Sequence, residues 1–81
     1  MTDPEVRAAY EAFSRARSRA GYRLFEEFVI GRGLDLDDQY WPEADRDEFD
    51  RRSDEQIKYW NAKAEELVAA AESGQLDTFT M

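Results

Sequence analysis

The chain has 81 residues, a formal net charge of −8, and neither cysteine nor histidine. This length allows one small domain over residues 1–81. The missing cysteines exclude disulfides, thiol nucleophiles and thiolate metal sites, and the missing histidines remove the commonest general base and most transition-metal ligands. We therefore expect no enzyme activity, no cofactor and no metal, and extra stability from oligomerisation or from docking on a partner.

The composition is 42% hydrophobic, 37% charged and 14% aromatic. The charged share exceeds the roughly 25% of an ordinary domain, but disordered acidic chains carry few aromatics. No apolar run approaches the ~20 residues that span a bilayer. Residues 1–20 are too polar for a signal peptide. These features predict a folded, water-soluble, cytoplasmic protein that does not contact a membrane.

The N-terminal segment is predicted to form a helix over about residues 3–30. Thr2 and Glu5 fit the two positions of a capping box, and Pro4 is tolerated in a first turn. The glycines of residues 31–33 favour the end of the helix there. At 100° per residue the apolar residues of this helix share one stripe. Its members are Val6, Ala9, Tyr10, Phe13, Ala16, Ala20, Leu24 and Phe28.

One charged residue, Arg17, points into this apolar stripe. A guanidinium in that position needs a partner or must extend its stem to water. Hydrogen bonding to Gln56 or stacking on the ring of Trp60 would satisfy it. The opposite side of the helix is expected to face water and carries Arg15, Arg19 and Arg23.

Residues 31–45 are predicted to connect two helices. They follow a second apolar face at the end of the first helix, formed by Tyr22, Phe25 and Val29. Either the connector folds back over this face, or the face and Trp41 anchor a protein partner. Aromatic residues off the main stripes are typical interface anchors. The predicted apolar partner-binding residues are Tyr22, Phe25, Val29, Trp41 and Tyr59.

A second helix is predicted over about residues 46–73, followed by a tail of residues 74–81. Asp45 and Ser53 both resemble helix caps, so two starts are open. Gly74 favours the end, with Leu76 placed for the hydrophobic contact that often follows a glycine cap. The apolar stripe of this helix comprises Phe49, Ile57, Trp60, Ala64, Leu67, Val68 and Ala71.

Together the two stripes predict an all-α fold, an antiparallel helical hairpin. Two helices bury only one side of each stripe, so a third layer is needed, either the connector or a second copy of the chain. The predicted core residues are Phe13, Arg17, Leu24, Phe28, Ile57, Trp60 and Leu67.

Acidic residues concentrate in residues 35–55, which have a net charge of −7, whereas residues 1–25 have a net charge of +2. Counted from Asp35, the glycine and glutamate positions of a calcium-binding loop hold Tyr40 and Arg46, so that pattern fails. The predicted acidic surface comprises Asp35, Asp37, Asp38, Asp45, Asp47, Asp50 and Asp54.

These observations predict a small acidic helical module that docks on a protein partner or on a second copy of itself, without binding nucleic acid directly. The alternative is an acidic inhibitor, of the kind that phages encode, which mimics nucleic acid and blocks a nucleic-acid-binding protein. The salt dependence of partner binding separates the two functions. An electrostatic mimic loses its partner as the salt concentration rises, whereas apolar docking hardly responds.

Overall fold

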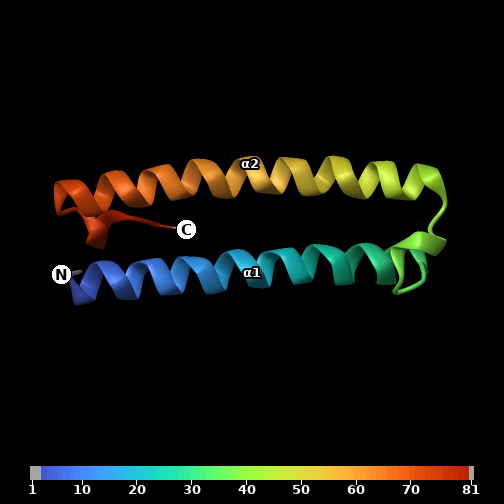
Figure 1. Ribbon diagram of the computed structural model, residues 1–81, viewed down its shortest axis with the longest axis horizontal. Coiled ribbons are helices and arrows are strands. Elements are labelled where there is room, and N and C mark those ends of the chain that lie inside the picture. Colours follow the sequence, from blue (N-terminus) through green and yellow to red (C-terminus); the bar gives the residue numbers. More distant parts are fainter. Residues whose placement is uncertain (1–2, 81) are drawn as a thin grey trace.

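The structure of the chain, a computed structural model, describes residues 3–80, and these contain helices and no strand. Two long helices, α1 (Pro4–Arg32) and α2 (Glu43–Ser73), run antiparallel to each other (Figure 1). A short 3-10 helix, η1 (Asp38–Tyr40), lies in the connector, and a second, η2 (Leu76–Thr78), follows α2. The molecule is 47 Å long and 20 by 17 Å across. The predicted all-α hairpin is confirmed.

The start of α1 is capped by Asp3, whose carboxylate accepts a hydrogen bond from the backbone N–H of Glu5 at 2.8 Å. The prediction that Thr2 caps this helix is therefore wrong. Aspartate is at least as good an acceptor as threonine, and Asp3 lies one residue closer to the first turn. Thr2 itself lies outside the described residues. Pro4 occupies the first turn, as predicted.

The end of α1 lies at Arg32, two residues beyond the expected end. Only Gly33 adopts the left-handed conformation, with φ of 62°. Gly31 stays helical, because a glycine permits the left-handed cap without requiring it. The N–H of Leu34 then donates to the carbonyl of Val29 at 3.0 Å and closes the last turn.

The start of α2 differs from both predicted starts, because the helix begins at Glu43 and continues unbroken past Ser53. Pro42 is the residue before the first turn, and no side chain caps the helix. The proline ring fixes φ at −56°. The acids of the first turn, Glu43 and Asp45, favour the positive end of the helix dipole. The end at Ser73, before the left-handed Gly74, is as predicted.

The apolar seam between α1 and α2 holds two separate buried clusters. Near the chain ends, Phe13, Trp60 and Leu67 are buried, and the Phe13 and Trp60 rings meet edge to face at 5.4 Å. Near the connector, Phe28, Val29 and Trp41 are buried with Phe25 and Phe49 against them. Small residues lie around the first cluster and let the helices approach each other. These are Ala9, Ala16, Ala20 and Ala64.

Three predicted core residues are less enclosed than expected. Leu24 is half-buried, Ile57 is 47% exposed, and Arg17 is exposed. Both Ile57 and Arg17 lie at the edge of the seam, because two helices bury only the narrow strip where they meet. Arg17 and Ile57 are therefore edge residues rather than core residues.

The partner of Arg17 is also different from the two predicted. Its Nη2 atom donates to Oδ1 of Asn61 at 3.3 Å, whereas Gln56 donates to the backbone carbonyl of Ala20 at 3.3 Å. Gln56 and Asn61 are five residues apart, or about 140° around the helix, and flank Trp60 on opposite sides. One guanidinium at the edge can reach only one of them.

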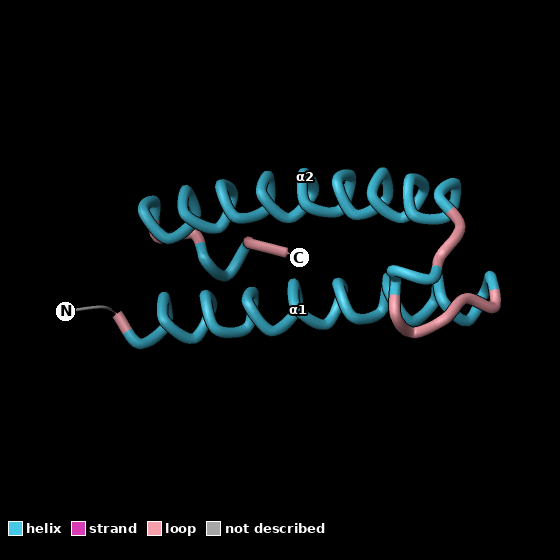
Figure 2. Tube along the Cα trace, turned by 45° about the vertical axis from the view of Figure 1, so that its right-hand side comes forward, coloured by secondary structure: helices cyan, strands magenta, loops and turns pink. Residues whose placement is uncertain are grey.

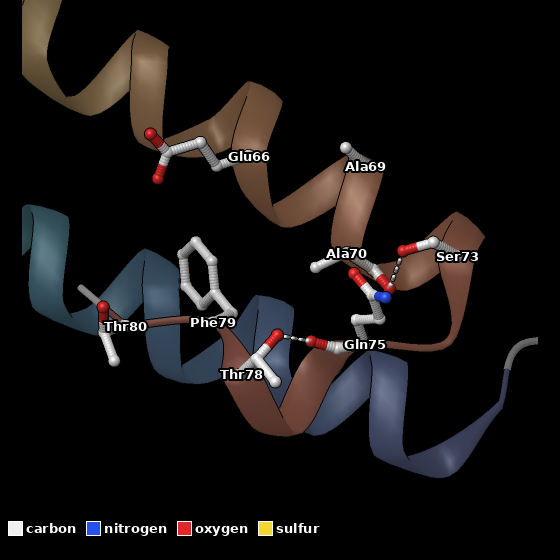
Figure 3. Close-up of a pocket in the computed structure, with 8 residues that line it drawn as sticks. All are labelled: Glu66, Ala69, Ala70, Ser73, Gln75, Thr78, Phe79 and Thr80. Atoms are coloured by element: carbon white, nitrogen blue, oxygen red, sulfur yellow. Dashed lines mark hydrogen bonds between the residues drawn. The ribbon is translucent and has the colours of Figure 1, made fainter.

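The C-terminal tail returns between the two helices (Figure 2). Phe79 follows η2 and places its ring between α1 and α2 (Figure 3), and its ring centroid is 6.4 Å from that of Phe13. Lys63 Nζ donates to the carbonyl of Thr80 at 3.3 Å. The tail thus supplies a partial third layer at the end where the chain termini meet.

Leu67→Ala should destabilise the fold strongly, because Leu67 is only 1% exposed and its removal leaves a cavity in the first cluster. We expect a loss of about 2–5 kcal/mol in the free energy of unfolding, measured by urea titration. Val68→Ala is the matched control, since Val68 is 41% exposed and should cost about 1 kcal/mol or less. Equal losses would contradict the position of the seam.

Candidate interaction surface

The connector folds back onto the seam through Trp41, which is only 6% exposed. Its ring stacks on Phe25 at 5.8 Å and lies 5.5 Å from Phe28 and 5.4 Å from Phe49. Its Nε1 donates to the backbone carbonyl of Asp35 at 2.6 Å. The indole therefore has both its apolar body and its polar group satisfied within the chain.

The structure divides the five predicted apolar partner-binding residues. Val29 and Trp41 are buried inside the hairpin, and Phe25 is half-buried against Trp41, so most of their surface is already covered within the chain. The reason is the return of the connector, one of the two alternatives that the sequence left open. Tyr22, at 73% exposed, and Tyr59, at 47%, remain accessible.

Trp41→Ala should therefore act as a core mutation. We expect a loss of about 3–5 kcal/mol in the free energy of unfolding, as for a large buried aromatic. The neighbouring Tyr40→Ala should leave stability nearly unchanged, because Tyr40 is 69% exposed. Far-UV circular dichroism during urea titration measures both. A Trp41→Ala variant as stable as the parent would show that the connector does not pack as described.

One side of the seam stays uncovered between the connector and the chain ends. The hydrogen bond from Arg17 to Asn61 marks this side. The tail contacts Lys63, which lies two residues after Asn61 and about 160° from it around α2. The tail therefore covers the side of the seam opposite the Arg17–Asn61 hydrogen bond. Trp41 of the connector stacks on Phe25, which lies about 80° around α1 from Arg17. The connector therefore covers the side marked by Arg17 only at the connector end of the hairpin.

This uncovered side, which we call the open face, is apolar around its central polar pair. From α2 it presents residues that recur every three or four positions, the spacing with which helices pack against one another. They include Ile57 and Val68, exposed by 47% and 41%. From α1 it presents Tyr10, exposed by 40%, and Gly21. The open face comprises Tyr10, Arg17, Gly21, Ile57, Asn61, Ala64 and Val68.

The open face has three levels, whose positions follow from the contact between Arg17 and Asn61. Seven residues back along α1 and seven forward along α2 place Tyr10 opposite Val68. Four residues in the other directions place Gly21 opposite Ile57. A Cβ added to Gly21 would meet no atom within 4 Å. The face therefore has a polar middle level, a bulky apolar level and a level with vacant space.

The carboxylates of three of the seven predicted acidic residues, Asp35, Asp37 and Asp45, are engaged within the chain. Asp45 pairs with Arg32 at 2.7 Å. The carboxylates of Asp35 and Asp37 accept backbone N–H groups of the connector turns at 2.8 and 3.1 Å, and the carbonyl of Asp38 accepts Arg46 Nη2 at 2.7 Å. These residues shape the connector.

The carboxylate of Asp38 in the connector has no partner among the described side chains, and neither have the exposed carboxylates of three residues on α2, Asp47, Asp50 and Asp54. The spacing of these three places them on the same side of α2 as Asn61, so they continue the open face toward the connector. Three of the predicted acidic residues thus form one short row at the edge of an apolar face.

A separate charge network lies on α2 around Glu48. Arg51 and Arg52 donate to its carboxylate at 2.6 and 2.9 Å, and Arg51 also contacts Glu55 at 2.7 Å. Hydrogen bonds from Arg51 and then Arg52 lower the pKa of Glu48 from 4.5 to about 2. The hydrogen bond that Arg51 donates to Glu48 in turn raises the pKa of Arg51. These ion pairs join neighbouring turns of α2 on the side of the helix that faces away from the connector.

Stability should therefore depend on pH through Glu48. A carboxyl whose pKa is lowered by folding stabilises the fold above its unfolded pKa and loses this effect as the pH falls through the folded value. The difference in unfolding free energy between the parent and Glu48→Gln should be full above about pH 5 and shrink between pH 4.5 and 2. Glu65→Gln gives the baseline for removing one charge. A difference that persists unchanged at pH 2 would contradict the network.

Within residues 3–80, no three acidic side chains gather closely enough to hold a metal ion, and no helix combines the length and apolarity needed to cross a membrane. Comparison of the chain with protein-family models, curated proteins and solved structures finds no match.

Proposed function

We propose that this chain is a non-enzymatic protein-interaction or assembly module that docks through its open face. The observation that carries the proposal is the row of half-exposed apolar residues that continues the packing pattern of the buried seam, with Ile57 and Val68 on α2 and Tyr10 on α1. Each buries further only if another helical surface lies against it.

The chemistry of the face fits docking. Tyrosine and arginine are enriched in interfaces, and the face carries both in Tyr10 and Arg17. The Arg17 guanidinium has five N–H groups, of which one donates to a described residue, Asn61. A partner that offers acceptors beside apolar side chains would therefore gain both orientation and buried area.

A second candidate function is the acidic inhibitor of a nucleic-acid-binding protein. Its support is the row of Asp47, Asp50 and Asp54, exposed carboxylates without an ion pair among the described residues. Such a row would attract the basic groove of a nucleic-acid-binding protein. We rank it second because the carboxylates of three of the seven acids that suggested it bind groups within the chain instead.

Immobilised variants separate the two candidates. The parent, Ile57→Glu/Val68→Glu and Asp47→Asn/Asp50→Asn/Asp54→Asn are exposed to a cytoplasmic extract. Bound proteins are identified by mass spectrometry at about 0.05 M and about 0.5 M salt. We expect a partner that is lost only by the apolar double variant and that is retained at the higher salt.

The matched control is Ala62→Glu/Ala69→Glu, which adds the same charge to exposed positions on the side of α2 away from α1. It should retain the partner. A partner lost with the three aspartates and with rising salt would support the inhibitor and contradict docking through the open face.

A further inference from the structure

The accessible surface of the chain is larger than its mass requires. It is 6183 Å², whereas a compact monomer of 9.5 kDa exposes about 5,000 Å². The radius of gyration is 16.4 Å, against about 12 Å for a compact chain of this length. The excess surface, about 1,200 Å², is enough to supply the roughly 800 Å² that each partner buries in a standard interface.

The open face can cover itself. A twofold axis parallel to the helices would set α1 of one copy against α2 of the other and keep the register of the hairpin. Arg17 of each copy would then face Asn61 of the other, a donor against an acceptor. In the same register Tyr10 would face Val68 across the interface.

The level of Gly21 and Ile57 also fits a second copy of the chain. Across that interface Ile57 of one copy would face Gly21 of the other, the position where an added Cβ meets no atom within 4 Å. A branched side chain and a vacant space on one surface are self-complementary, as an interface related by a twofold axis requires.

From these observations we infer that the occupant of the open face is a second copy of this chain, and that the two hairpins form an antiparallel four-helix bundle. This inference rests on the proposed function and names its partner. Each copy carries a charge of −8, so the copies repel at long range and associate through the apolar levels. Salt screens this repulsion and should tighten the dimer.

Sedimentation equilibrium of the purified chain tests the inference. We expect a species of twice the 9.5 kDa chain mass, with a dissociation constant that falls as salt rises. Ile57→Glu/Val68→Glu should raise the dissociation constant by about 30-fold or more, the effect of losing a central interface anchor. Ala62→Glu/Ala69→Glu adds the same charge and should leave it within a few-fold of the parent.

Gly21→Lys keeps the test valid if the apolar double variant unfolds. Lysine favours a helix more than glycine, and its Cβ enters open space in the single hairpin, so the fold should persist by circular dichroism. It also lowers the charge repulsion between copies, so a weaker dimer would result from steric overlap and from burial of the ammonium, and not from net charge. We expect Gly21→Lys to be monomeric where the parent is dimeric.

Three results would overturn the inference: a parent that stays monomeric at every concentration, a dimer unaffected by Gly21→Lys, or a dimer that dissociates as salt rises. A monomeric parent that binds a different protein through Ile57 and Val68 would leave the proposed function standing. A monomeric parent that binds nothing through these residues would remove both.

Discussion

The hairpin depends on one seam of apolar packing between two antiparallel helices. Edge-to-face contact between Phe13 and Trp60 anchors it near the chain ends, and Trp41 closes it near the connector. A helix has several sides, and a single neighbour covers only one of them. Every other feature of the molecule follows from how the remaining sides are covered or left open.

The chain covers its seam from two directions with short pieces of irregular structure. The connector returns over Phe25 and Phe28, and the tail brings Phe79 onto Phe13 from the opposite side. Between them the open face keeps half-exposed apolar residues next to the pair of Arg17 and Asn61. A core of this size gives a small domain little stability, so a partner that covered the open face would also stabilise the fold.

The helices and their antiparallel packing could be predicted from the sequence because their apolar residues recur at the helical period. The exact caps could not, since Asp3 and Pro42 compete with equally plausible neighbours. The interaction surface was harder to predict from the sequence. Trp41 in an irregular connector has no periodicity to indicate a direction, so burial and partner binding were equally compatible with its sequence. The open face arises from the register of two helices, which neither stripe encodes alone.

The central claim is that the seam leaves one apolar side to be covered by association. The most direct test is the urea midpoint of unfolding, measured on the parent chain at two protein concentrations that differ by a large factor. Because unfolding of an associated hairpin also separates its copies, the account predicts a midpoint that rises with protein concentration. A midpoint that is independent of concentration would show that the single hairpin is complete without a second copy.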